Sequence, residues 1–202
     1  MEEDENPMPD TMSDPEKVAA TVRLLTLDKQ TENHFLGHRK PGGIGRIYGG
    51  QVVAQALAAA QNTVDPARRP HSLHAYFLRG GDEDYRIEFS VARDFDGGSF
   101  SNRRVIAAQN GVPILNLTAS FHRQEDGLSH QIPMPEVLMP EDLETEDEVM
   151  KRLGRPIKAM AAFRRNRSYE IRMPPISPDG RLNDRGHAYF WFRMKAPLPA
   201  DT

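Results

Sequence analysis

The sequence of 202 residues contains no cysteine. Disulfide bonds, thiolate metal sites and a cysteine nucleophile are therefore excluded, and an intracellular, cytoplasmic location is the simpler expectation. No stretch approaches the ~20 consecutive apolar residues that a membrane-spanning helix needs, so we expect no membrane span. Lysine and arginine (26) do not outnumber aspartate and glutamate (29), and the formal net charge of -3 argues against a nucleic-acid partner.

The first residues, 1–14, are acidic and rich in proline, and they lack the apolar segment of a secretory signal. We expect them to form a disordered tail. Ser13 or Asp14 can cap a first helix, with Pro15 at its first position.

Residues 15–124 have the pattern of one folded domain. Apolar residues recur at helical spacing from Gly49 to Asn62. Strand-like segments follow, and Asn110-Gly111 between two of them is typical of a hairpin with a type I′ turn. A helix followed by an antiparallel meander excludes alternating βαβ units and predicts the α+β class. The expected strands are residues 71–78, 84–95, 99–109 and 112–123.

The character of the chain changes at Glu125. Residues 125–167 are first acidic and proline-rich and then basic, and they predict a linker with short helices, one of them from Glu141 to Leu153 and stopped by Gly154. Residues 168–202 contain two further strand candidates, "SYEIRMPPI" and "HAYFWFRMKA".

The glycine-rich stretch "PGGIGRIYGGQVV" invites comparison with nucleotide-binding loops. Tyr48 stands where a dinucleotide-binding fingerprint needs its next glycine. Gln51 and Val52 replace the Lys and Ser/Thr of a phosphate-binding P-loop. Both nucleotide interpretations fail on residue type.

Two interpretations of Gly49-Gly50 remain open. The glycines can let helix and sheet approach closely, which is the more common reason for such a pair. Alternatively, the unpaired amides at the helix start can hold a polar carbonyl or a developing oxyanion.

Other catalytic patterns are weak. The stretch from Gly97 to Ser101 lacks the last glycine of a G-x-S-x-G elbow and lies at a turn. His71 and His74 are three residues apart, which predicts opposite faces of a strand and no shared metal ion. We therefore expect no metal, and solvated charges explain the pairs Arg103-Arg104 and Arg164-Arg165.

Three segments together resemble a known family. "YGGQVVAQALAAA", "HSLHAYFLRGGD" and "RDFDGGSFSNRRVIAAQNGVPILNLTASF" occur in the order found in the TesB-like acyl-CoA thioesterase II family. The resemblance runs from about Leu24 to Phe121 and resumes weakly in the two later strand candidates. It implies two hotdog repeats in one chain, each an antiparallel sheet wrapped round a long central helix.

The resemblance also implies an activity. The family hydrolyses fatty acyl-CoA to CoA and a free fatty acid without metal or cofactor, using an Asp, a Gln and a Ser or Thr to activate water. In the family these residues belong to the second repeat, with the Asp inside a Ser-Asp pair on its helix. The only Ser-Asp here is Ser13-Asp14, so the expected acid lies beyond Thr202. We expect a chain truncated in its second repeat and inactive alone, whether as a fragment, a premature stop or a gene-model error.

Other functions compete with hydrolysis. A non-catalytic acyl-CoA-binding or oligomerisation module fits the chain as written. A dehydratase of the same fold is disfavoured because neither His71 nor His74 has an evident acid partner. The expected substrate-binding residues are Tyr48, Gly49, Gly50 and Gln51 at the helix start, with His71 on the adjoining strand. We expect a homo-oligomer, and an exposed apolar "AYFWF" before a frayed end after Ala196.

Overall fold

The computed structural model describes residues 12–40, 42–152, 154, 167–173 and 189–199. Most of the expected acidic tail, the basic part of the linker, the segment between the two later strands and the last three residues lie outside these ranges. The chain divides into two compact units, residues 1–10 with 22–128 and residues 11–21 with 129–202. Each unit is described separately below.

Helix α1 (Asp14–Leu25) begins where the sequence predicts. The backbone N–H and the Oγ of Ser13 both donate to Oε2 of Glu16 at 2.7 Å, one half of a capping box. These hydrogen bonds hold the pKa of the Glu16 carboxyl below its usual range. Ser13 is thus the cap, and Pro15 occupies the second helical position, not the first.

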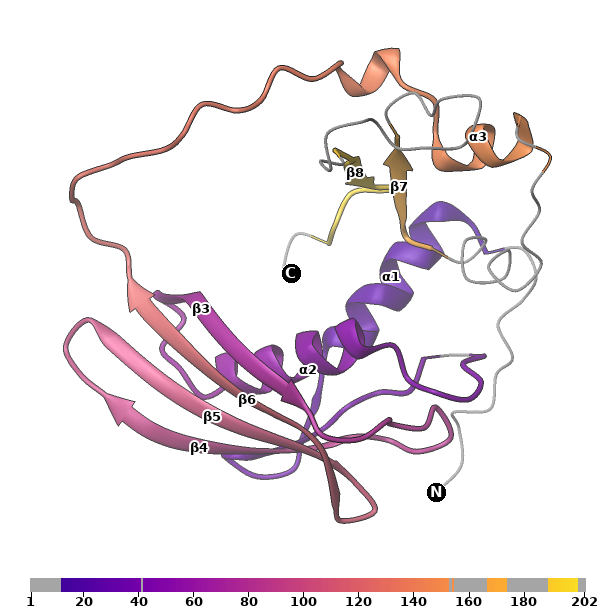
Figure 1. Cartoon of the computed structure of the whole chain (residues 1–202). Coiled ribbons are helices and arrows are strands. Elements are labelled where there is room, and N and C mark those ends of the chain that lie inside the picture. Colours follow the sequence, from indigo (N-terminus) through magenta and orange to yellow (C-terminus); the bar gives the residue numbers. More distant parts are fainter. Residues whose placement is uncertain (1–11, 41, 153, 155–166, 174–188, 200–202) are drawn as a thin grey trace. The chain divides into compact units, whose positions relative to one another are not determined.

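The first unit is built on an antiparallel sheet of six strands in the order β1-β2-β4-β5-β6-β3 (Figure 1). The turn between β5 and β6 contains Asn110 at φ +50° and Gly111 at φ +74°, as a type I′ hairpin requires. Strands β4, β5 and β6 form the predicted meander, but the prediction is wrong for β3, which pairs with β6 and not with β4, its successor in the chain. The strands are β1 (Asp28–Lys29), β2 (His34–Leu36), β3 (Arg68–Phe77), β4 (Glu88–Asp96), β5 (Phe100–Gln109) and β6 (Val112–Arg123).

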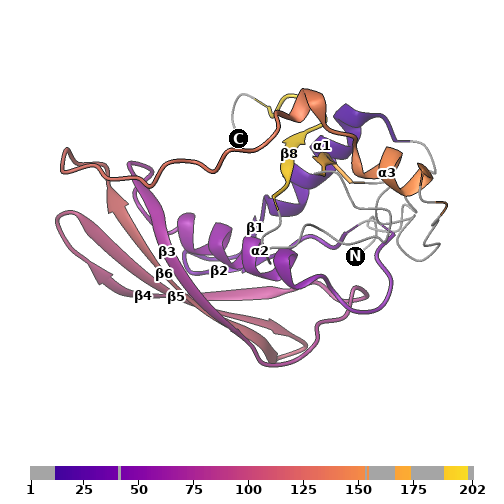
Figure 2. The same ribbon diagram turned by 45° about the horizontal axis from the view of Figure 1, so that its top comes forward.

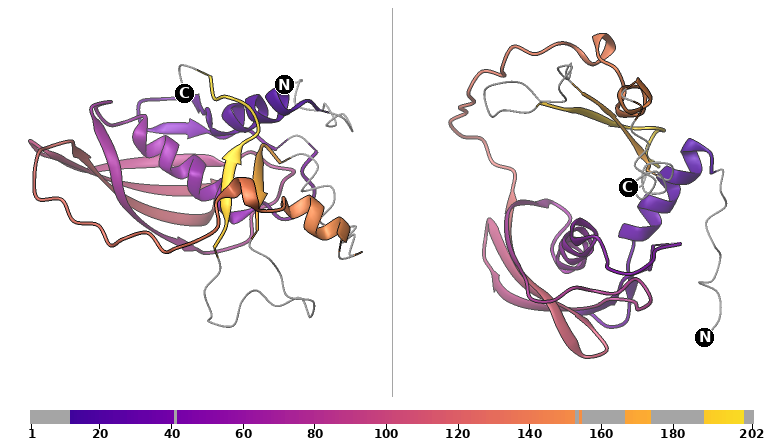
Figure 3. Two further views of the ribbon diagram at one scale, coloured as in Figure 1. Left: turned by 90° about the horizontal axis from the view of Figure 1, so that it is seen from above. Right: turned by 45° about the vertical axis from the view of Figure 1, so that its right-hand side comes forward.

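Helix α2 (Gly49–Gln61) lies in the hollow of this curved sheet (Figures 2 and 3). Ala56, Ala59 and Ala60 are fully buried, and these small side chains let the helix axis approach the sheet closely. The sheet supplies larger partners to the same core, among them Phe89, Val105, Leu115, Leu117 and Phe121. One helix enclosed by one antiparallel sheet is the expected hotdog arrangement.

The predicted alternation with a period of two holds from Ile87, which is buried one residue before β4, to Val91. Phe89 and Val91 are buried, whereas Glu88 and Ser90 are exposed. Tyr85, which the pattern also placed inside, is 49% exposed. The prediction is wrong there because the regular strand begins only at Glu88.

Arg103 is the largest fully buried polar side chain of the first unit, at 1% exposure, so its interpretation as a solvated charge is wrong. Its guanidinium donates to Thr63 Oγ1 (2.8 Å), to the carbonyl oxygens of Thr63 and Phe95 (both 3.0 Å) and to Asp96 Oδ1 (2.7 Å). The Ser101 hydroxyl and this guanidinium together lower the pKa of Asp96. The network fixes the segment after α2 to the β4–β5 hairpin.

The second unit contains a 3₁₀ turn (Pro140–Asp142, η1), helix α3 (Glu146–Arg152) and the antiparallel pair β7 (Tyr169–Arg172) and β8 (Trp191–Met194). Helix α3 is shorter than predicted, because the acidic residues before Glu146 form the separate turn η1. Gly154 has φ +61°, in keeping with the predicted helix stop. Phe190 and Phe192 are exposed, as expected of "AYFWF".

Candidate functional site

The site starts from the first residues of helix α2. Tyr48 caps the helix with extended backbone (φ -65°, ψ 124°), and its side chain makes no capping hydrogen bond. The Gln51 N–H donates to the Tyr48 carbonyl oxygen at 3.0 Å, whereas the amides of Gly49 and Gly50 precede any intrahelical acceptor. The helix start therefore presents backbone donors and the positive end of the helix dipole.

Both glycines are required by close neighbours. A Cβ on Gly49 would lie 2.8 Å from Cζ of Phe77 in β3, and one on Gly50 would lie 2.4 Å from Cε1 of Tyr48. Gly49 thus permits the close approach of helix and sheet that the sequence suggested. This packing does not displace the backbone amides of Gly49 and Gly50. The interpretation that these amides hold a polar carbonyl or an oxyanion therefore also stays open.

A cavity of about 370 Å³ adjoins the helix start. Its wall comes from the segment before α2, the first turn of α2, the end of β3 with the residues after it, and β6. None of its lining residues is a carboxylate or a histidine. They are Arg46, Ile47, Gly49, Val52, Phe77, Leu78, Arg79, Gly80, Gly81 and Ile114.

Backbone contacts join two segments of the cavity wall, the one before α2 and the one after β3. Arg46 forms an antiparallel β-bridge with Asp82, and the Ile47 N–H donates to the Gly81 carbonyl oxygen at 3.0 Å. The Gln109 side chain braces the second segment, because it accepts from the Asp82 N–H (2.9 Å) and donates to the Asp82 carbonyl oxygen (2.8 Å). The cavity wall is thus tied to the end of β5.

Comparisons with known proteins bear on what this site serves. A family model described as "Acyl-CoA thioesterase N-terminal domain" matches residues 38–122. Acyl-CoA thioesterase 2 of Haemophilus influenzae is 35% identical over 183 residues, which are 89% of this chain and 64% of that protein. The crystal structure of the acyl-CoA thioesterase II TesB2 from Mycobacterium marinum aligns with TM-score 0.67 and 35% identity, over 89% of this chain and 62% of that one. The chain belongs to the acyl-CoA thioesterase II family.

The chain spans somewhat less than two thirds of the length of these two thioesterase relatives. The hotdog fold is supported by a further structure, a protein of unknown function with a hot dog fold from Alicyclobacillus acidocaldarius. It aligns with TM-score 0.68 and 20% identity, over 87% of this chain and 62% of that one. At that identity the likeness concerns the fold alone.

The structure does not bring together all of the residues expected to bind substrate. Gly49 lines the cavity, and Tyr48, 66% exposed, and Gly50 adjoin it in the chain. Gln51 is buried within α2 and does not line the cavity. His71 lies six residues before Phe77 in β3, roughly 20 Å along an extended strand, so it is not beside the helix start.

His71 occupies instead the sheet face turned away from α2. Its Nε2 is 2.9 Å from the Ser120 Oγ, and its ring lies edge-on to Phe100 and His122. His74 is on that face too, opposite Thr118. The predicted placement of His71 and His74 on opposite faces is wrong because a bulge between Pro70 and Ser72 shifts the register by one residue.

Within the described ranges, no group of three or more histidine, aspartate or glutamate side chains is arranged to hold a metal ion. Nor is any helix of the described residues long and apolar enough to cross a membrane.

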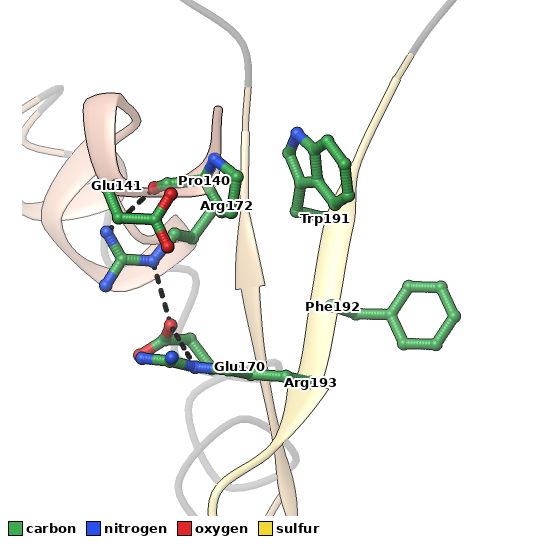
Figure 4. Close-up of a pocket in the computed structure, with 7 residues that line it drawn as sticks. All are labelled: Pro140, Glu141, Glu170, Arg172, Trp191, Phe192 and Arg193. Carbon is green, nitrogen blue, oxygen red and sulfur yellow. Dashed lines mark hydrogen bonds and ion pairs between the residues drawn. The ribbon is translucent and has the colours of Figure 1, made fainter. Parts of the chain in front are cut away.

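A second pocket, of about 160 Å³, lies in the second unit between η1 and the β7–β8 pair (Figure 4). Three of its four charged side chains pair with each other: Glu170 accepts from the Nε of Arg172 (2.9 Å) and lies 3.4 Å from the Nε of Arg193. Arg172 also donates to the carbonyl oxygens of Pro140 and Leu143. These contacts join η1 to the strand pair, and we take the pocket as structural.

Glu83 is a buried carboxyl next to the cavity wall, at 5% exposure. Its Oε2 has no hydrogen-bond partner among the described residues, and a Cβ on Gly43 would lie 2.7 Å from it. Burial raises the pKa of Glu83, although Lys40 and Arg39 act in the opposite direction. The ionised form is therefore disfavoured in the folded protein.

We expect Glu83→Gln to stabilise the protein at neutral pH. As pH rises above the unfolded-state pKa of about 4.3, the unfolded chain ionises before the folded one, so the wild type loses stability through Glu83. The free energy of unfolding that Glu83→Gln adds should therefore increase between about pH 4 and pH 7 and vanish in acid. Urea unfolding at several pH values measures it, and a gain equal at all pH values would contradict this origin.

Proposed function

We propose that the chain serves the hydrolysis of fatty acyl-CoA thioesters to CoA and a free fatty acid. The observation that carries the proposal is the cavity at the start of α2, within the region that matches the thioesterase N-terminal domain. An apolar wall next to backbone donors suits a ligand with an apolar stem and a polarised carbonyl.

In the proposed reaction a water oxygen adds to the thioester carbonyl carbon. The carbonyl oxygen becomes an oxyanion, and amides such as those of Gly49 and Gly50 stabilise charge that develops at such a position. When the tetrahedral intermediate collapses, the C–S bond breaks, the fatty acid is released and the CoA sulfur takes up a proton. The attacking water needs a general base, and we assign none, because no lining residue has a side chain suited to that role.

A binding module without catalysis is the second candidate. The same lack of a carboxylate or histidine in the cavity wall favours it, since such a site can hold an acyl-CoA without activating water. The two candidates predict the same ligand and differ in whether the C–S bond breaks.

Release of CoA separates the candidates. The chain has no cysteine, so a thiol reagent reports only the CoA that hydrolysis frees. Hydrolysis by this chain would give release that follows saturation kinetics with a series of fatty acyl-CoA thioesters, and it would overturn the expectation that the chain is inactive alone. Saturable binding without release would support the module, and neither binding nor release would contradict both candidates.

We also propose that the chain forms a homo-oligomer through strand β3. This strand is an edge of the sheet, and Leu73 (45% exposed) and Phe77 (58% exposed) lie opposite the buried Ala119 and Leu115, on the face that carries α2. An uncovered edge flanked by apolar side chains favours pairing with a second strand.

A positive charge introduced into the edge strand β3 should weaken the oligomer. We expect Leu73→Lys to shift the mass measured by light scattering toward the monomer, because a lysine at the edge strand opposes pairing. Ile106→Lys, at a 38% exposed position on the other face of the sheet, is the matched control and should leave the mass unchanged. Equal effects of both substitutions, or none, would contradict the role of β3.

For the organisation of the chain, we propose an N-terminal hotdog repeat over residues 15–124, a linker over 125–167 and the start of a second repeat over 168–202. Limited proteolysis tests this division, because cleavage should concentrate outside residues 15–124. We propose that the protein acts in the cytoplasm, for which the lack of cysteine is the support. Cell fractionation tests the location.

A further inference from the structure

Two arginines line the cavity at the start of α2, and neither is neutralised by a carboxylate. Within the described ranges, no aspartate or glutamate oxygen lies within 4.0 Å of a side-chain nitrogen of Arg46 or Arg79. Other arginines of this unit, at positions 86, 103 and 104, each pair with an aspartate. Neither guanidinium of the cavity wall therefore has a direct ion-pair partner among the described residues.

The nearest candidate to neutralise Arg46 is Asp82, which faces it across the β-bridge. The Oδ1 of Asp82 accepts the Asp84 N–H at 3.0 Å, in a local turn of its own backbone. Asp82 is not a lining residue of the cavity. Its carboxylate forms no ion pair with Arg46, so the Arg46 guanidinium can still bind an anion.

The backbone positions both guanidinium groups. A Cβ on Gly80 would lie 2.7 Å from the Nε of Arg46 and 3.0 Å from its Cζ, so the Arg46 side chain lies directly against the Gly80 backbone. The Nη1 of Arg79 donates to the Pro113 carbonyl oxygen at 3.0 Å. A guanidinium has five N–H donors, so this bond leaves most of those of Arg79 available to a ligand.

The rest of the wall is apolar. Ile47, Val52, Phe77, Leu78 and Ile114 line the same cavity, whose size of about 370 Å³ falls within the range of small-molecule sites. The first turn of α2 adds the positive end of its dipole at Gly49. The matching ligand is an organic anion with a flexible, weakly polar stem.

We infer that Arg46 and Arg79 bind phosphate groups of the CoA part of the substrate, with the pantetheine stem along the apolar wall. Two separate guanidinium groups suit a ligand with several phosphates, because each can donate two parallel hydrogen bonds to one phosphate. The inference rests on the proposed function for the identity of the ligand. It assigns the nucleotide end of acyl-CoA, and not the acyl chain, to this cavity.

Titration calorimetry with CoA tests the assignment. We expect Arg46→Gln and Arg79→Gln each to weaken binding about tenfold, which corresponds to about 1.4 kcal/mol, and the double variant to weaken it more than either. Gly80→Ala should weaken it less than Arg46→Gln, because the added methyl group displaces the Arg46 side chain without removing it. Arg104→Gln, whose partner Asp94 lies on another part of the sheet, is the matched control and should bind as the wild type does.

Competition by fragments of the substrate shows whether the phosphates of CoA or the carboxylate of a fatty acid bind to the two arginines. Adenosine 3′,5′-bisphosphate should compete with CoA in the wild type and lose that ability in the double variant, whereas a fatty acid should not compete. Competition by the fatty acid alone, or equal CoA affinity in the wild type and the double variant, would overturn the inference.

Failure of the inference can be told apart from failure of the proposed function. If the double variant binds and processes acyl-CoA as the wild type does, the phosphate assignment is wrong and the proposed function stands. If the wild type binds adenosine 3′,5′-bisphosphate through these arginines but ignores acyl thioesters, the anion site stands and the proposed function is wrong. Circular dichroism of each variant verifies its fold.

Discussion

Arg103→Leu is expected to lower the free energy of unfolding by about 3 to 5 kcal/mol. The guanidinium is 1% exposed and donates to both the side chain and the backbone oxygen of Thr63, to the Phe95 carbonyl oxygen and to Asp96. A leucine fills part of the volume but removes this donor from the oxygens of the buried Thr63, whereas Asp96, 51% exposed, keeps the Ser101 hydroxyl as a donor. Urea unfolding followed by circular dichroism measures the loss.

The neighbouring arginine provides the control for this prediction. Arg104 points to the other face of β5, where its side chain is 52% exposed and pairs with Asp94. Exposed ion pairs contribute about 0 to 1 kcal/mol, so Arg104→Leu should change the stability by no more than that. Similar losses for the two variants would show that Arg103 does not hold the hairpin as described.

Phe89→Ala is the second substitution with a large expected effect, a loss of about 3 to 5 kcal/mol. Phe89 is 0% exposed near the start of β4 and lies opposite Phe35 of β2 and Ala107 of β5. Removing the ring takes buried apolar surface from the core and leaves a cavity that the strands can close only in part. The same unfolding measurement detects the loss.

The same strand contains a matched control. Phe95 also lies in β4 but is 56% exposed, so Phe95→Ala should cost much less than Phe89→Ala. If the two truncations had equal effects, the assignment of the two faces of β4 would be wrong.

Local patterns in the sequence predicted the elements of the first unit. The Asn110-Gly111 pair predicted its turn because only residues that tolerate positive φ fit there. The alanines of α2 predicted a slim central helix, and alternation predicted the buried Phe89 and Val91. These features depend on neighbours in the chain or on one repeating period, which a single sequence displays directly.

Features that depend on distant segments were predicted less well. A bulge between Pro70 and Ser72 moved His71 to the outer face of the sheet, and no local pattern marks a bulge. Arg46 and Arg79 are 33 positions apart in the sequence and meet at one cavity only after the sheet has folded. The only sequence signal was the "RGG" directly after β3, whose glycines make room for the Arg46 side chain and for close backbone pairing.

The most direct test of the central claim, that an acyl-CoA thioester binds at the start of α2, is hydrogen–deuterium exchange with a non-hydrolysable acyl-CoA thioether. We expect slower exchange of amides in residues 46–53 and 78–81, because these segments form the cavity wall and the helix start. Residues 100–106 of β5, which do not line the cavity, should exchange at the same rate with and without the ligand. No protection at all, or protection confined to residues 169–172 and 191–194 of the second unit, would contradict the claim.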